Sequence, residues 1–444
     1  MQPANTISKT TVFEGNQLNR QAPAVLSDNA RCAIRGTDAE SRRVSFPLSD
    51  DLLSKHLLFI GGIGMGKTNG IFQILSQLRN HMTSNDVMLI FDTKGDFYES
   101  FYQPGDIVIS NDEKATGPNG KDFWNIFEEI SAGANTEEEI VEIARALFFE
   151  RSNKSSQPFF PNAARDLFTG IMLHFHRMGG IKNNAVLRDF LDQTPSAEIR
   201  AILQQHQDLK AMTSYISDDR SPQTQGVISE LQQHLREIFI GNFRKEGSLS
   251  IRKSIRAKQG RLVFVEYDLG IGGMLTPIYQ LMLDMAIKEA LSRKKSEGNV
   301  WFIIDEFRLI PNLQHIDDGI NFGRSMGAKF IIGVQNIEQV FHAYGEAQAH
   351  SILSGLLTTV AFRVNDAATR KFIQELLGKN RKTYTALWLA VTKSPSRDIW
   401  QARKAVRCAI CGAMSKRTTL WPRPMSWVRA NMVRTNRENA GALW

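Results

Sequence analysis

The 444-residue chain contains little cysteine and no long apolar run. Its three cysteines are too few for a disulfide framework, which favours a reducing compartment. Its apolar runs are much shorter than the roughly 20 residues of a membrane-spanning helix, so we expect no transmembrane segment in this chain. Residues 1–30 are polar, and we expect no secretory leader there. These absences predict a cytoplasmic globular protein.

Acidic residues are scarce only near the carboxyl end. Residues 384–444 hold eight Arg, three Lys, one Asp and one Glu, a net charge of +9. Of the 54 basic and 46 acidic residues in the chain, 43 and 44 therefore lie in residues 1–383. The high pI of the chain, about 9.3, is therefore due to this tail. Net charge alone is therefore no argument for nucleic-acid binding by the rest of the chain.

Short apolar runs alternate with helical patterns along most of the sequence. Runs that predict buried parallel strands occur at residues 56–60, 87–91, 106–109, 261–267, 299–304, 329–334 and 359–364. Helical patterns follow several of them, at about 68–82, 276–294, 317–326 and 366–377. Between residues 123 and 255 the strand-like runs stop, and helical spacing takes over. The pattern predicts an α/β fold, a doubly wound, mainly parallel sheet with an inserted all-α domain.

A glycine-rich motif follows the first of these runs and opens a helix. It has the P-loop spacing and consists of Gly61, Gly62, Ile63, Gly64, Met65, Gly66, Lys67 and Thr68. Its glycines let backbone amides approach the β- and γ-phosphates of a nucleotide. Lys67 supplies a positive charge to those phosphates, and the Thr68 hydroxyl is a ligand for Mg²⁺. We therefore predict that these residues bind ATP and Mg²⁺.

A second motif supplies the acids that ATP hydrolysis needs. Asp305 and Glu306 follow the apolar run at residues 300–304. We predict that Asp305 holds Mg²⁺ through water and that Glu306 polarises the attacking water.

Two further residues are candidates for the same reaction. Gln335 ends the run at residues 329–334, where its amide reaches the γ-phosphate and the water, or else satisfies loop amides. Arg324 lies at the end of the preceding helical pattern. It is either an arginine finger for a neighbouring subunit or a surface arginine.

Four motifs together carry a family resemblance. They are residues 56–68 with the P-loop, Phe-Asp-Thr-Lys-Gly-Asp at 91–96, Phe-Ile-Ile-Asp-Glu at 302–306, and residues 323–335. The set resembles the HerA/FtsK superfamily of P-loop NTPases, and within it the type IV secretion coupling proteins, the TraD/TraG-like conjugative ATPases. Residues 158–165 and 362–366 are also similar, and the resemblance covers residues 31–382. Asp92, Lys94 and Asp96 match a signature on the strand next to the P-loop, without an assigned chemical step.

The resemblance implies a RecA-like core that assembles as a homohexamer and hydrolyses ATP while moving DNA. Such a motor delivers DNA, with its relaxase and relaxosome proteins, to a type IV secretion channel in conjugation. Many coupling proteins carry transmembrane helices. This sequence departs from that pattern. It therefore resembles the minority of coupling proteins without such helices, or it is recruited to the cytoplasmic face of the bacterial inner membrane by a separate partner. Two alternatives stay open: a HerA-like DNA-processing translocase, and an ATP-binding recruitment adaptor with little turnover.

We expect the following domain organisation. Residues 1–30 form a disordered polar lead-in, 31–122 and 256–382 the RecA-like nucleotide-binding domain, 123–255 the all-α insertion that recognises DNA or the relaxosome, and 383–444 an atypical tail. The tail holds five of the seven Trp. This tail is either the product of translation in a shifted reading frame or a basic, aromatic DNA-binding extension.

A cluster of basic residues near the end of the expected insertion has two possible roles. It consists of Arg244, Lys245, Arg252, Lys253, Arg256 and Lys258. It either follows a phosphate backbone or forms a solvated face.

Overall fold

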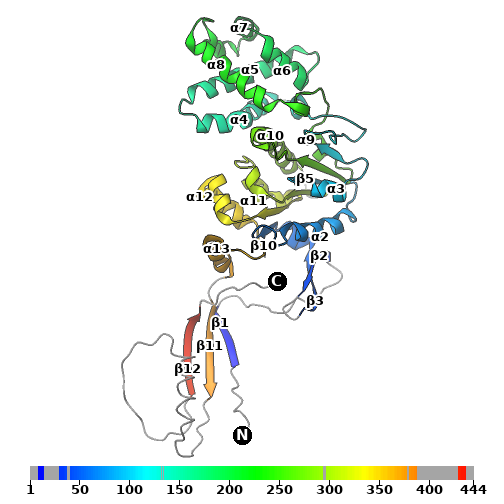
Figure 1. Cartoon of the computed structure of the whole chain (residues 1–444), viewed down its shortest axis with the longest axis vertical. Helices are drawn as coiled ribbons and strands as arrows, with labels where there is room; N and C mark the ends of the chain where they lie inside the picture. Colours follow the sequence, from blue (N-terminus) through cyan, green and yellow to red (C-terminus); the bar gives the residue numbers. More distant parts are fainter. Residues whose placement is uncertain are drawn as a thin grey trace, which may run out of the picture. The chain divides into compact units, whose positions relative to one another are not determined.

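Figure 1 shows the computed structural model of the chain, which describes residues 9–14, 30–37, 41–131, 133, 135–293, 297–377, 380–387 and 429–436. The chain divides into two compact units. One unit comprises Gln21–Arg370 with Ala442–Trp444, and the other comprises Met1–Arg20 with Lys371–Gly441.

The second of these units contains a three-stranded antiparallel sheet. Its strand order is β1 (Lys9–Glu14), β11 (Asn380–Leu387) and β12 (Arg429–Asn436). Strand β1 lies within residues 1–30, for which the sequence has no clear periodicity. The rest of that range before Ala30, and residues 388–428 and 437–444 of the basic tail, lie outside the described residues.

The larger unit is built on a seven-stranded parallel sheet. Its strands are β4 (Leu57–Ile60), β5 (Val87–Asp92), β6 (Ile107–Ile109), β7 (Arg261–Glu266), β8 (Val300–Ile304), β9 (Ala328–Val334) and β10 (Thr358–Ala361). They are the expected apolar runs, and the α/β fold class is confirmed. Strand β10 ends before residue 364 because the chain turns toward the loop after β4. Phe362 N still donates to Ile60 O at 2.7 Å, and Gly62 N then donates to Arg363 O at 2.9 Å.

The order of the strands is β10-β4-β9-β8-β5-β7-β6. Strand β9 therefore lies between β4, which leads into the P-loop, and β8, which leads into Asp305. This is the additional-strand arrangement of RecA-like folds. The expectation that Asp92 lies on the strand next to the P-loop is wrong, because β9 and β8 separate β5 from β4. Order along the chain does not give order in a doubly wound sheet, since crossovers can skip strands.

Helical patterns were expected at 68–82, 276–294, 317–326 and 366–377, and the observed helices differ from these bounds by at most four residues. Helices flank the strands of the sheet along the chain. They are α1 (Asp50–Ser54), α2 (Lys67–Arg79), α3 (Asp96–Phe101), α10 (Gly272–Leu291), α11 (Ile316–Met326), α12 (Ile337–Gly355) and α13 (Ala367–Leu377). Alternate strand residues such as Phe59, Ile90 and Ile303 pack with Ile71 and Ile74 of α2 in one buried core. The hairpin of β2 (Ala30–Thr37) and β3 (Arg43–Ser49) contributes Cys32 and Leu48 to the same core.

The chain between β6 and β7 is helical. It forms α4 (Thr136–Lys154), α5 (Phe159–Met178), α6 (Asn184–Gln193), α7 (Ser196–Gln204), α8 (Pro222–Ile238) and α9 (Ile251–Ala257). Helices α4 to α8 lie together in Figure 1. Local signals define their starts: the side chains of Asn183 and Ser221 cap α6 and α8, and Pro222 occupies the first turn of α8. Among the helices of the described ranges, none is both long and apolar enough to cross a bilayer.

The two ends of this helical segment are fastened to each other. Trp124 pairs with Leu249 in a parallel bridge, and Leu249 N donates to Phe123 O at 3.0 Å. The fully buried Glu129 carboxylate accepts from Trp124 Nε1 at 2.8 Å and from Ile251 N at 2.7 Å. Burial raises the pKa of Glu129 against these hydrogen bonds. The segment by which the chain leaves the sheet, residues 123–129, is therefore bonded to the segment by which it returns, residues 249–251. We call these two segments together the stem.

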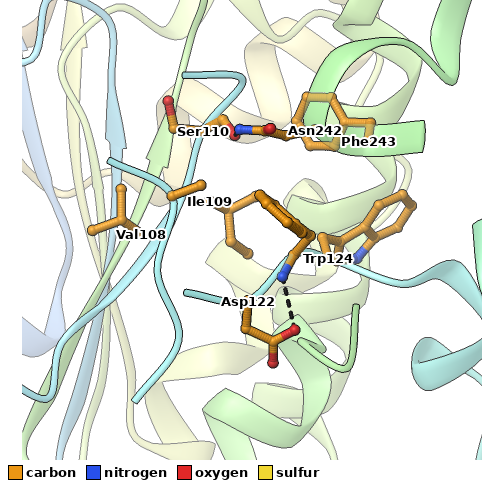
Figure 2. A pocket seen from close by; sticks show the side chains of 9 residues that line it. Val108, Ile109, Ser110, Asp122, Trp124, Asn242 and Phe243 are labelled. Carbon is orange, nitrogen blue, oxygen red and sulfur yellow. Dashed lines mark hydrogen bonds between the residues drawn. The ribbon is translucent and has the colours of Figure 1, made fainter. Parts of the chain in front are cut away.

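The stem is packed against the end of β6. Figure 2 shows Asn242 and Phe243, which precede the returning chain, beside Val108, Ile109 and Trp124. Asn242 Nδ2 donates to Ser110 O at 2.9 Å, and the rings of Trp124 and Phe243 meet edge to face.

Candidate functional site

The P-loop connects β4 to α2 at the carboxyl edge of the sheet. Gly64 and Gly66 have φ values of 72° and 103°, which only glycine adopts readily. Lys67 Nζ donates to the carbonyl oxygens of Gly61 at 2.7 Å and Gly62 at 3.3 Å. Burial lowers the pKa of Lys67, and the negative charges of Asp305 and Glu306 oppose this. The loop therefore encloses a positive charge at the start of a helix. Two apolar side chains of the motif point outward, Ile63 with 78% of its surface exposed and Met65 with 38%.

Thr68 and Asp305 lie in direct contact, although 237 positions separate them in the sequence. Thr68 Oγ1 donates to Asp305 Oδ2 at 2.7 Å. The other carboxylate oxygen, Asp305 Oδ1, is buried and has no hydrogen-bond partner within the described ranges. Burial raises the pKa of Asp305, while Thr68 and Lys67 lower it. An unpartnered carboxylate oxygen beside a hydroxyl is a donor set that a hard divalent cation prefers.

Glu306 and Gln335 face each other from neighbouring strands. Gln335 Nε2 donates to Glu306 Oε2 at 2.5 Å, and Arg308 Nε donates to Glu306 Oε1 at 3.1 Å. Gly61 N also donates to Val334 O at 3.1 Å, which ties the P-loop to the end of β9. The structure thus brings the P-loop, the acid pair and Gln335 to one edge of the sheet.

Gly333 is a positioning residue that the sequence analysis missed. A Cβ atom at this position would lie 2.2 Å from the carbonyl oxygen of Asp305. Only glycine therefore lets β9 run against the end of β8. The signal was present, because a glycine inside an apolar strand marks a close backbone approach.

The structure separates the roles of Asp92 and Lys94. The buried Asp92 carboxylate accepts from the backbone amides of Lys94, Gly95 and Tyr98, at 3.2, 2.9 and 2.9 Å, and so shapes the loop that begins α3. The pKa of Asp92 is raised by burial, against these bonds. Lys94 is exposed, and its charge lowers the pKa of both Lys67 and Asp305. Lys94 therefore adds positive charge near the P-loop, while Asp92 is structural.

Lys94 also lines a polar cleft of about 260 Å³. The cleft lies beyond the ends of β5, β6 and β7, and Lys114 and Glu266 form an ion pair of 2.8 Å in its wall.

Arg324 lies far from the P-loop of its own chain. It is in the last turn of α11, just before β9 begins, whereas the P-loop follows the opposite ends of the parallel strands. The seven residues of β9 span about 23 Å at roughly 3.3 Å per residue. Arg324 is half exposed and donates to Asp51 Oδ1 at 3.0 Å. It therefore contributes nothing to the nucleotide site of its own chain.

The basic cluster at the end of the helical segment is paired within the chain. Arg252 contacts Glu139 at 2.8 Å, Arg256 contacts Glu289 at 2.9 Å, and Arg244 contacts Asp189 at 2.8 Å. Lys253 pairs with Glu128, Lys245 lies over the ring of Phe123, and Lys258 donates to Glu297 O. These contacts favour a structural role over an open phosphate-binding stripe.

The fold and the site define a RecA-like P-loop protein of the additional-strand type. The family model described as type IV secretion-system coupling protein DNA-binding domain matches residues 42–411, and the chain belongs to this family.

Relatives in the same family are similar over most of the chain. Coupling protein TraD of Escherichia coli (strain K12) is 21% identical over 385 residues, which are 84% of this chain and 51% of TraD. The chain thus spans about half the length of this relative. The solved structure of the conjugative coupling protein TrwBΔN70 in complex with sulphate has a TM-score of 0.63, 18% identity and 84% coverage of both chains. TrwB in complex with ADP and Mg²⁺ has a TM-score of 0.62 and 18% identity, with 86% of this chain and 85% of TrwB covered.

Proposed function

We propose that this protein is an ATP-dependent DNA-translocating motor, a coupling protein that delivers DNA to a type IV secretion channel in conjugation. The observation that carries the proposal is the contact of Thr68 with Asp305 beside the Glu306–Gln335 pair, all next to the P-loop. Family membership supports the DNA substrate and the secretion channel. The printed descriptions of TrwB complexes, with ADP and Mg²⁺ and with a non-hydrolysable ATP analogue, support ATP as the nucleotide.

The residues fit a nucleotide with Mg²⁺. Backbone amides of the P-loop and Lys67 would hold the phosphates. Thr68 and the free Oδ1 of Asp305 would hold Mg²⁺, directly and through water, and the ion would neutralise charge on the phosphates. Glu306 accepts a proton from the attacking water. Gln335, already bonded to Glu306, orients that water and senses the γ-phosphate.

The proposal extends to assembly and partners. We assign residues 31–122 and 256–382 to the nucleotide-binding domain and residues 123–255 to recognition of DNA or the relaxosome. A homohexamer would bring Arg324 of one subunit to the nucleotide of the next, since Arg324 and the P-loop lie at opposite edges of the sheet. The further partners that we propose are a relaxase and a membrane protein that recruits this protein to the cytoplasmic face of the inner membrane.

Replacing Asp305 with Asn is expected to raise the Mg²⁺ concentration needed for half-maximal hydrolysis by about 10–100-fold. The amide keeps an acceptor for Thr68 but removes the charge that holds the ion. A Mg²⁺ titration of ATP hydrolysis measures the effect, with Asp318→Asn, an exposed aspartate of α11, as the control. Identical titration curves for Asp305→Asn and wild type would remove Asp305 from the metal site.

The proposed function is tested by ATP hydrolysis of the purified protein, alone and with single- or double-stranded DNA. We expect turnover that DNA stimulates several-fold, because a translocating motor couples hydrolysis to contact with its track. ATP binding without turnover under every DNA condition would refute the motor and leave a recruitment adaptor. Turnover that only double-stranded DNA with a partner nuclease stimulates would instead indicate a HerA-like processing translocase.

A further inference from the structure

The chain between Glu306 and α11 is held by side chains from helices on several sides. This connecting segment, residues 307–315, begins with the short helix Phe307–Leu309. The buried Asp284 of α10 accepts from Gln314 N at 3.1 Å and His315 N at 3.0 Å. The hydroxyl of Tyr344, from α12, donates to Ile310 O at 2.9 Å. The connecting segment is therefore fixed to the helices that cover the sheet.

Two further contacts come from α4, the first long helix of the helical segment. His315 Nε2 lies 2.5 Å from Glu142 Oε1, and the same carboxylate pairs with Lys288 of α10. About two turns further along α4, Glu150 Oε1 accepts from Asn312 Nδ2 at 2.7 Å. Asn312 has a φ of 57°, a left-handed conformation that this side-chain contact helps to hold.

The position of the connecting segment gives these contacts a consequence. It directly follows Glu306, the proposed base, and directly precedes α11, which carries Arg324 in its last turn. Helix α11 moves as a unit because its backbone is internally bonded. A displacement of α4 therefore acts directly on Asn312 and His315, which lead into α11, and it reaches Glu306 through the five residues between Glu306 and Asn312.

We propose that Glu142 and Glu150 are positioning residues for ATP hydrolysis, through which the helical segment sets the placement of Glu306 and α11. This inference rests on the proposed function, since it assigns a control to the same reaction. It also gives the helical segment a direct connection to the chemistry: DNA or a partner that shifts α4 changes the geometry of the base.

The charges around His315 make the contact with Glu142 sensitive to pH. The hydrogen bond that His315 donates to Glu142 raises the pKa of His315 against burial. The charge of Asp284 raises this pKa further, and the charge of Lys288 lowers it. Burial opposes ionisation of Glu142, but His315 and Lys288 hold its pKa below the usual range. The charged pair is therefore complete below the raised pKa of His315, and it is lost as pH rises through that pKa.

The test compares the double variant Glu142→Ala/Glu150→Ala with wild type and with Glu138→Ala. Glu138 is exposed on the same helix and makes no ion pair or hydrogen bond within the part of the chain that the structure describes. We expect kcat with DNA to fall about tenfold in the double variant, within the ~100-fold that a 1 Å misplacement can cost. KM for ATP is expected to stay unchanged because the P-loop is untouched, and this also reports that the variant is folded.

A second readout separates positioning from general stability. Glu142→Gln keeps an acceptor for His315 but removes the charge, so turnover is expected to recover toward wild type at pH values below the pKa that His315 has in this variant. The alkaline fall of kcat is expected to move to lower pH in Glu142→Gln, because the pKa of His315 loses its main support.

The outcomes are distinguishable. Suppose that the wild-type protein hydrolyses ATP. An unchanged kcat in the double variant, or an unshifted pH profile in Glu142→Gln, would then overturn this inference alone. Wild-type protein without turnover would overturn the proposed function and this inference with it.

Discussion

Replacing Glu306 with Gln is expected to lower kcat for ATP hydrolysis by ~10²–10⁴-fold while ATP still binds. The substitution keeps the shape of the side chain, and its amide can still bond to Gln335, which lies 2.5 Å from Glu306 Oε2. It removes the carboxylate that accepts the proton of the attacking water. Because Lys67 and Thr68 are unchanged, a fluorescent ATP analogue should bind with wild-type affinity.

The matched control for this change is Glu338→Gln. Glu338 is exposed in the first turn of α12, three positions after Gln335. The Glu338→Gln protein should hydrolyse ATP at the wild-type rate. Near-normal kcat in Glu306→Gln would show that another group activates the water, and the assignment of the base would be wrong.

Replacing Arg324 with Ala is expected to lower kcat by ~10³–10⁵-fold, the range for an arginine finger. Arg324 cannot act on the nucleotide of its own chain, because it lies beyond the opposite ends of the strands. Its effect therefore requires a neighbouring subunit. Binding of ATP to the single subunit should be unchanged, since no P-loop contact is removed.

Two experiments distinguish this role from a structural one. Asp51→Asn weakens the same ion pair but keeps the guanidinium. It should have little effect, because an exposed pair contributes only about 0–1 kcal/mol. Mixing Arg324→Ala with Glu306→Gln subunits should restore part of the turnover, since some interfaces then combine an intact arginine with an intact base. An active Arg324→Ala protein, or a mixture without recovery, would contradict the finger.

The sequence contains enough information to predict the sheet and its nucleotide-binding loop. The strands are short runs that are almost entirely apolar, such as Val87–Asp92 and Val300–Ile304, and burial on both faces distinguishes them from amphipathic helices. The P-loop, the acid pair and Gln335 each follow such a run. Parallel strands then bring them to one edge.

Other features depend on contacts that no local pattern records. Strand order needed the structure, because apolar runs do not specify which neighbour they pair with, and β5 was misplaced for this reason. The contact of Glu142 with His315 joins positions 173 residues apart, and neither residue lies in a motif. The sequence left open whether the basic cluster follows a phosphate backbone or forms a solvated face, because its acidic partners, such as Glu139 and Glu289, are distant in the sequence.

The closed stem of the helical segment bears on how this protein can evolve. Trp124 and Leu249 are partners in a parallel bridge, in which Leu249 is hydrogen-bonded to Phe123 and Asn125, so the excursion between them starts and ends at one place. The entropy of closing such an excursion grows slowly, by about 0.6 kcal/mol for each doubling of its length. Changes of length within the excursion therefore cost the closure of the stem little, although α5 is constrained by its packing on α4, and α8 by its contacts with α4 and α10. The length of the excursion can therefore vary while the stem, α4 and the nucleotide site are kept.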